Sequence, residues 1–84
     1  MKSIWNINEN ALEAELTFSS FKEAMDFMFA CVNIISEHNH HPNWSNVYKQ
    51  VHISLTTHDA GNTITEKDRK LAQAIEELYW QTLS

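Results

Sequence analysis

Five histidines lie in one stretch of the chain, residues 36–68, together with its only proline and only glycine. Imidazole is the one side chain whose unperturbed pKa lies near neutrality, so histidines gathered in one region suggest proton transfer or metal binding. His40 and His41 follow a predicted helix, and His58 ends a predicted strand just before a turn. Side chains at such positions are held by the scaffold yet remain reachable. We therefore interpret His40, His41 and His58 as an acid/base site.

The other two histidines have simpler explanations. His52 lies in mid-strand on the polar face, where pairing with a neighbouring strand explains it, and His38 lies at a helix end. For each of the remaining three taken alone, a structural role explains the residue as well as a functional one. Neighbouring side chains of an extended segment point to opposite sides, so His40 and His41 are not expected to do the same job.

A metal site is the main alternative from the residues alone. Histidines at 38, 40, 41 and 58 offer enough ligands for zinc. Structural zinc sites, however, typically use cysteine pairs or histidines spaced along one helical face. The H-x-H-H pattern has neither feature, so we expect no metal and no other cofactor.

Two pairs of strands are expected to hold the histidines in place. Residues 4–7 have strand composition and residues 8–10 have turn composition, and strict alternation of apolar and polar residues follows over 12–18. A polar turn between two such runs predicts a hairpin. The buried face of the second run is expected to hold Leu12, Ala14, Leu16 and Phe18.

The second strand pair leads to His58. Residues 51–58 alternate cleanly, which predicts a long strand. We place a tight turn at Lys49-Gln50, which separates a further strand over 44–48 and gives four strands in all. Residues 59–62 have turn composition, with Gly61 free to take a positive φ. The buried face of the long strand is expected to hold Val51, Ile53, Leu55 and Thr57.

The first helix is predicted to begin after Ser20, which with Glu23 fits the pattern of mutual capping at a helix start. It ends by about residue 38, because Pro42 and its polar neighbours disfavour continuation. Further apolar residues make its apolar surface wider than one sheet face covers, which suggests packing against another subunit. Its core stripe is predicted to be Phe21, Met25, Met28, Val32 and Ile35.

The last helix is predicted to begin at a second capping pair, Thr65 with Asp68, and to end by Leu83. Trp80 lies off its stripe and is expected to be exposed or to face another subunit. The element order is then β-β-α-β-β-α. A small antiparallel sheet of about four strands with two main helices on one face is an α+β fold. The apolar stripe of the last helix is predicted to hold Leu71, Ala72, Ile75, Leu78 and Tyr79.

Length and composition limit the function classes. The 84 residues form a single domain over 1–84. A net charge of −5, with scattered basic residues, argues against a nucleic-acid partner. No apolar run approaches the ~20 residues of a membrane span, and the N-terminus lacks a signal-peptide core. Cys31 is the only cysteine, so no internal disulfide forms. We expect a cytoplasmic protein without a membrane partner.

Three motifs stand out over residues 40–72 of the chain: HHPNW at 40–44, VYKQVHISLTTHDAG at 47–61, and T-x-x-D at 65–68 followed by LA. Together they resemble the pterin-4a-carbinolamine dehydratase family. Trp5 and the segment FSSFKEAMDFM at 18–28 are also similar to the family. The resemblance covers nearly the whole chain, and the combination of HHP with THDAG is specific.

The resemblance implies a dehydratase, a lyase that converts 4a-hydroxytetrahydropterin to quinonoid dihydropterin and water during tetrahydropterin recycling. His40 and His58 match the acid/base histidines of the family, and His41 matches the histidine that positions substrate. Pro42 belongs to the same motif. We hypothesise that Trp44 walls the pocket and offers the flat pterin an aromatic face. Asp68 matches the family's aspartate and is predicted, with Pro42, to bind substrate, although capping of the last helix explains Asp68 as well. Members are homodimers or homotetramers.

The chain also departs from the family pattern. Ser36 and Asn39 stand where members often carry acids, which leaves the acid/base histidines in place but questions a carboxylate partner that would tune them. The alternative function is a non-catalytic pterin-binding, protein-interaction or regulatory module on the same fold. The intact HHP and THD elements favour the enzyme, because a pure scaffold need not keep them.

Overall fold

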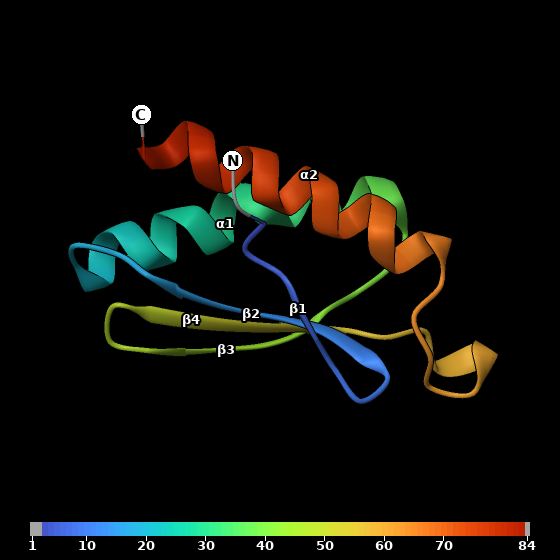
Figure 1. Cartoon of the computed structure of the whole chain (residues 1–84). Coiled ribbons are helices and arrows are strands. Elements are labelled where there is room, and N and C mark those ends of the chain that lie inside the picture. Colours follow the sequence, from blue (N-terminus) through green and yellow to red (C-terminus); the bar gives the residue numbers. More distant parts are fainter. Residues whose placement is uncertain (1–2, 84) are drawn as a thin grey trace.

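A computed structural model describes residues 3–83 of the chain (Figure 1). Four antiparallel strands form one sheet in the order β1-β2-β4-β3, and both helices cover the same face of it. The expected α+β fold with the order β-β-α-β-β-α is confirmed. The elements are β1 (Asn6–Asn8), β2 (Ala11–Thr17), α1 (Phe21–His38), β3 (Asn43–Val47), β4 (Gln50–Leu55) and α2 (Glu66–Leu83).

The two hairpins are shifted slightly from their predicted positions. The first strand begins at Asn6 rather than at residue 4, because Trp5 packs against the core and its indole N–H donates to the Ala72 carbonyl of α2 at 3.0 Å. The second turn is Tyr48-Lys49, one residue earlier than predicted, and Gln50 already pairs with β3. Tyr48 takes a φ of 55°, in the left-handed region that a two-residue hairpin turn requires.

The core lies between the helices and the inner face of the sheet. The alternation predicted for the two central strands is confirmed, since every second side chain is buried. β2 and β4 pair directly, so their inward side chains form one continuous apolar layer. This layer consists of Leu12, Ala14, Leu16, Phe18, Val51, Ile53 and Leu55, with Thr57 at its end.

The face that α1 turns to the core is only partly the predicted one, since Ile35 is buried and Met28 is partly buried as expected. Phe21, Met25 and Val32 lie on the outer side, where they are 50%, 40% and 48% exposed. The apolar side of the helix is wider than the face that the core covers, so helical periodicity fits more than one stripe within it. Phe27 settles the orientation, because its ring packs 5.1 Å from that of Phe18. The buried stripe is Ala24, Phe27, Cys31 and Ile35.

Cys31 lies in the middle of this buried stripe with no exposed surface. Burial raises the pKa of its thiol to about 12. The residue packs as a small apolar side chain, which is the usual role of a buried free cysteine.

The last helix buries the predicted stripe. Leu71, Ala72 and Ile75 are buried, while Leu78 and Tyr79 are partly buried against the core. Trp80, which lies off this stripe, is partly buried and donates its indole N–H to a Glu76 carboxylate oxygen at 3.0 Å. Neither helix in residues 3–83 combines the length and apolar character of a membrane span.

The alternation along β4 predicts opposite effects for neighbouring substitutions. Ile53 has no exposed surface, so Ile53→Ala removes buried methyl groups and is expected to lower the free energy of unfolding by about 2–5 kcal/mol. Ser54, one residue further, points to the other face, and Ser54→Ala is expected to stay within about 0.5 kcal/mol of wild type. Urea denaturation measures both, and equal losses would contradict the assigned strand faces.

Candidate active site

His40 is held at the point where the chain leaves α1. Asn39 ends the helix in the left-handed region, with a φ of 49°, and its N–H bonds to the Ser36 carbonyl at 3.1 Å. This turn sends the next residue back towards the start of α2. There the Nε2 atom of His40 lies 2.5 Å from the Oδ1 atom of Asp68. The side chain of His40 is 12% exposed, so the imidazole is held in place yet can still be reached.

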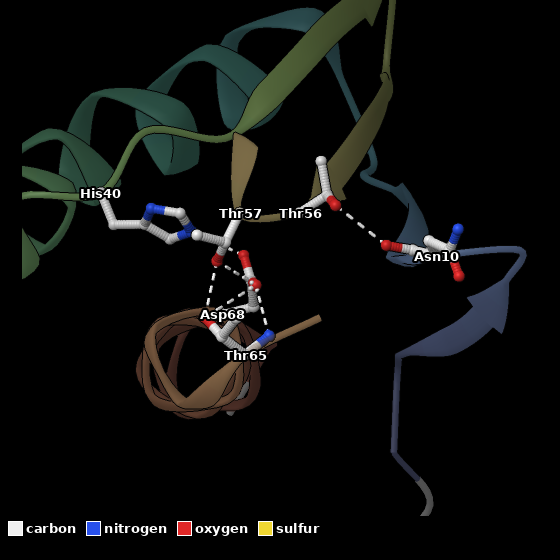
Figure 2. A network of polar contacts seen from close by, with 6 residues as sticks. All are labelled: Asn10, His40, Thr56, Thr57, Thr65 and Asp68. Atoms are coloured by element: carbon white, nitrogen blue, oxygen red, sulfur yellow. Dashed lines mark hydrogen bonds and ion pairs between the residues drawn. The ribbon is translucent and has the colours of Figure 1, made fainter. Parts of the chain in front are cut away.

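Asp68 lies in the first turn of α2 and has no exposed surface. Its Oδ2 atom accepts a hydrogen bond from the Thr57 hydroxyl at 2.6 Å and one from the Thr65 N–H at 2.8 Å. The two threonine hydroxyls also bond to each other at 2.6 Å. Figure 2 shows these side chains converging with His40 at the beginning of α2. We call His40, Thr57, Thr65 and Asp68 the carboxylate network.

The network determines the charge of Asp68. Burial on its own would raise the pKa of this carboxyl group, but hydrogen bonds from Thr57, His40 and the Thr65 backbone hold the pKa below its ordinary value of 3.8. Asp68 is therefore ionised at neutral pH. The capping role predicted for this residue is present, because Oδ2 bonds the Thr65 N–H at the start of α2, and the other oxygen, Oδ1, contacts His40. A carboxylate partner for His40 is therefore present although Ser36 and Asn39 are not acids, and it lies 28 residues further along the chain.

His58 lies in a short 3-10 turn, His58–Ala60, directly after the inward-facing Thr57. Its imidazole is exposed, and its Nδ1 atom lies 2.9 Å from the side-chain carbonyl oxygen of Asn62. Gly61 and Asn62 both take positive φ values, 83° and 58°, which fold the loop back and bring Asn62 to the imidazole. In the part of the chain that the structure describes, no hydrogen bond joins His58 to His40 or His41.

His41, Pro42 and Trp44 line one small hollow of about 230 Å³, together with Val32, Ile35 and Ser36 of α1. His41 is exposed and Trp44 is partly buried. The two neighbouring histidines therefore lie in different surroundings, His40 against a buried carboxylate and His41 at a mostly apolar hollow. Within the HHPNW motif, His41, Pro42 and Trp44 line the hollow, whereas His40 belongs to the carboxylate network.

The remaining histidines make the structural contacts proposed for them. The Nε2 atom of His52 lies 3.0 Å from a Glu13 carboxylate oxygen on the neighbouring strand β2. The Nδ1 atom of His38 lies 2.9 Å from the Ile34 carbonyl, in the last turn of α1. Over residues 3–83, no three side chains of His, Cys, Asp or Glu are grouped so that they could hold a metal ion.

The sequence interpretation missed the part that Thr57 and Asn62 play around the histidines. Thr57 was assigned to the buried face of a strand, and a hydroxyl at such a position must find a hydrogen-bond partner. That requirement was the available signal, because the nearest polar groups after the turn belong to the capping pair, Thr65 and Asp68. Asn62 gave only the signal of turn composition.

Comparisons with known proteins identify the family of the chain. The model of the family described as pterin 4 alpha carbinolamine dehydratase matches residues 1–78. A relative from Prochlorococcus marinus subsp. pastoris, named "Putative pterin-4-alpha-carbinolamine dehydratase", is 47% identical over 75 residues, covering 89% of this chain and 77% of the relative. A relative of the same name from Opitutus terrae is 45% identical over 76 residues, covering 90% and 78%.

Solved structures show the same fold. The crystal structure of a transcriptional coactivator/pterin dehydratase from Brucella melitensis has a TM-score of 0.81 and 30% identity, with 89% of this chain and 81% of that chain covered. A pterin dehydratase-like protein described as a RuBisCO assembly factor in the alpha-carboxysome has a TM-score of 0.71 and 23% identity, covering 92% and 89%, and shows likeness of fold alone. By family model, sequence identity and fold, the chain belongs to the pterin 4 alpha carbinolamine dehydratase family.

Proposed function

We propose that this protein dehydrates 4a-hydroxytetrahydropterin to quinonoid dihydropterin by histidine acid/base catalysis, as a step of tetrahydropterin recycling. Family membership supports the reaction class. The observation that carries the mechanism is the pairing of His40 with the buried, ionised Asp68, which holds an imidazole at an accessible position. The reaction needs no redox partner, because water is lost without any change in the number of electrons.

The proposed chemistry uses two proton transfers. The bond between C4a and its hydroxyl oxygen breaks, and an imidazolium supplies the proton that lets the hydroxyl leave as water. A neutral imidazole takes the proton from N5, and the electron pair of that N–H bond forms the C4a=N5 double bond. His40 and His58 are the two imidazoles in this proposal. General acid/base groups with pKa values near the working pH are well suited to both steps.

Binding of the pterin is assigned to the HHPNW motif. Trp44 offers an aromatic face to the flat ring, and His41 with Pro42 forms the edge of the same hollow. Asp68, which the sequence analysis placed among the substrate-binding residues, has no exposed surface. We propose that it acts on the substrate through His40 and is a positioning residue.

A non-catalytic role is the competing proposal. A protein of the same fold is described as a RuBisCO assembly factor, although its 23% identity carries no function to this chain. The two proposals differ in one measurable respect, namely turnover of chemically generated 4a-hydroxytetrahydropterin. Absence of turnover by the wild-type protein would support the interaction module and exclude the dehydratase.

The proposed assembly is a homodimer or homotetramer. Phe29 is 80% exposed on the outer side of α1, where Phe21, Met25 and Val32 are also exposed. These four residues follow one another at spacings of three to four, so they form one apolar stripe along the helix. Exposed stripes of this kind mark interaction surfaces, and we infer that a second copy of the chain covers it.

Loss of either proposed catalytic imidazole tests the mechanism. His40→Ala and His58→Ala are each expected to lower kcat for dehydration by about 10²- to 10⁴-fold. The measurement follows the absorbance of the quinonoid product in excess of the uncatalysed reaction. His52→Ala is the matched control, since His52 pairs with Glu13 on the sheet and is expected to leave kcat unchanged. Wild-type rates in both site variants would refute the assignment.

Asp68→Asn tests the charge of the carboxylate network. The asparagine side chain keeps one acceptor oxygen, but its NH2 group replaces the other oxygen and faces groups that are themselves donors. The free energy of unfolding is therefore expected to fall by about 3 kcal/mol at neutral pH. Because the folded state lowers the pKa of Asp68, its stabilising contribution is complete well above pH 3.8 and is lost as the pH falls below that value. The difference between wild type and variant should therefore shrink in acid.

The control for this experiment is Asp59→Asn, which removes an exposed carboxylate from the turn His58–Ala60. Its unfolding free energy, followed by urea denaturation across the same pH range, is expected to stay close to wild type. If both variants lose the same stability, or if the loss at Asp68 does not depend on pH, the charge assignment is wrong.

Phe29→Glu tests the proposed assembly. A charge on the apolar stripe is expected to reduce the molar mass measured by light scattering to that of a single chain, because the glutamate would be buried without a partner. Ile7→Glu places the same charge on another exposed apolar residue, 66% exposed on β1, and is expected to leave the mass of the assembly unchanged. A wild-type protein that is already monomeric would refute self-association.

A further inference from the structure

The two oxygens of the Asp68 carboxylate have separate partners. Oδ2 accepts from the Thr57 hydroxyl and from the Thr65 N–H, which fills the two positions at which a carboxylate oxygen readily accepts. The Thr65 hydroxyl also lies 3.4 Å from Oδ2, but it lies closer to the Thr57 hydroxyl. The Thr57 hydroxyl has one hydrogen, and Asp68 takes it. The 2.6 Å contact between the two threonines must then have Thr65 as the donor and Thr57 as the acceptor. Oδ1 is left facing Nε2 of His40.

This arrangement decides which nitrogen of His40 carries hydrogen. An ionised carboxylate can only accept, so Nε2 must be the donor across the 2.5 Å contact. In the neutral imidazole, Nδ1 then has no hydrogen and offers a lone pair. The atom of His40 that can take or return a proton is therefore Nδ1, while Nε2 stays bonded to Asp68 (Figure 2).

The same reasoning assigns His58 the opposite tautomer. Its Nδ1 atom lies 2.9 Å from the Oδ1 atom of Asn62, which as an amide oxygen accepts, so Nδ1 donates. The atom of His58 free for proton transfer is Nε2. The loop that brings Asn62 to this position is closed by the backbone of Thr57, whose N–H donates to the Thr63 carbonyl at 2.9 Å.

Thr57 therefore touches the support of both imidazoles. Its hydroxyl orients Asp68 and, through it, His40. Its backbone carbonyl accepts from the N–H groups of Ala60 and Asn62, at 3.3 and 3.1 Å, within the loop that carries His58. Thr57 itself is buried, with 9% of its surface exposed, so it has little surface for contact with a substrate.

We propose that Thr57 is a positioning residue shared by both histidines, and that its hydroxyl orients the Asp68 carboxylate, which makes His40 present Nδ1 to the substrate. This inference rests on the dehydratase function proposed above. It adds which nitrogen of His40 exchanges a proton with the substrate and which residue holds the carboxylate that determines this nitrogen. The backbone contacts of Thr57 with the loop of His58 remain in any side-chain variant. The hydroxyl contact with Asp68 can be removed by Thr57→Val, which replaces the hydroxyl with a methyl group of similar size.

The first test uses the wild-type protein. Long-range ¹H–¹⁵N correlation at alkaline pH, where imidazole is neutral, separates nitrogens with and without hydrogen, and His40→Gln assigns the signals. His40 is expected to show hydrogen on Nε2 and a lone pair on Nδ1. The reverse tautomer, or an equal mixture of both, would overturn the proposal. This measurement needs neither substrate nor a folded variant of Thr57.

The second test compares three substitutions. Thr57→Val keeps the shape and removes the hydroxyl, and it is expected to lower kcat for dehydration about 10- to 100-fold, the effect of losing a partner that orients a functional imidazole. KM should change little, because Thr57 does not bind substrate. Thr57→Ser restores the hydroxyl and should recover most of kcat. Thr56→Val is the matched control, since the Thr56 hydroxyl donates to the Asn10 carbonyl, away from the carboxylate network (Figure 2).

The outcomes separate this inference from the proposed function. If wild type turns over the substrate but Thr57→Val is no slower than Thr56→Val, the positioning role fails while the dehydratase stands. A folded Thr57→Ser that is as slow as Thr57→Val would also overturn it, because the hydroxyl would then be irrelevant. If wild type shows no turnover, the dehydratase fails, and the Nε2 hydrogen of His40 still tests the role of Thr57. Its exchange with solvent is expected to be faster in Thr57→Val than in wild type, and equal exchange would show that the hydroxyl does not hold Asp68 against the imidazole.

Discussion

A single buried negative charge links the fold of this protein to its site. Asp68 has no contact with solvent, and an isolated carboxylate in such a place would be strongly unfavourable. It is satisfied by donors from three parts of the chain, namely the segment after α1, Thr57 beyond the end of β4, and Thr65 directly before α2. The positive end of the α2 dipole adds to this stabilisation. The contact that docks α2 at the end of the sheet is therefore also the contact that holds His40.

The separation of these residues in sequence has a consequence for how the site forms. His40 lies 28 residues from Asp68, and Thr57 lies 11 residues from it. None of these contacts can exist in a locally ordered hairpin or helix, so the network forms only when the sheet and both helices are assembled. Site geometry and global folding should therefore be lost together, which is unlike a loop site on an independent scaffold.

Much of the fold was predictable because its signals are local. Strict alternation in β2 and β4 identified the buried side chains, and the capping pairs located the starts of both helices. The core face of α1 was only partly predictable, since the apolar side of the helix is wider than the part that is buried, and the contact of Phe27 with Phe18 selects that part. The pairing of His40 with Asp68 was hidden, because a helix cap already explained the carboxylate. The sequence pattern indicates only the capping contact of Asp68, whereas the structure shows that its second oxygen also contacts His40.

The buried thiol of Cys31 makes the protein unusually convenient for labelling. Thiolates are the species that react with alkylating agents and oxidants, and burial keeps this one protonated, with its pKa raised to about 12. The native chain is therefore close to inert towards maleimide reagents while it stays folded. A cysteine introduced at an exposed position beside the site, such as Asp59→Cys next to His58, would be the one reactive thiol. A fluorophore attached there would report on the loop of His58 without any need to remove the native cysteine.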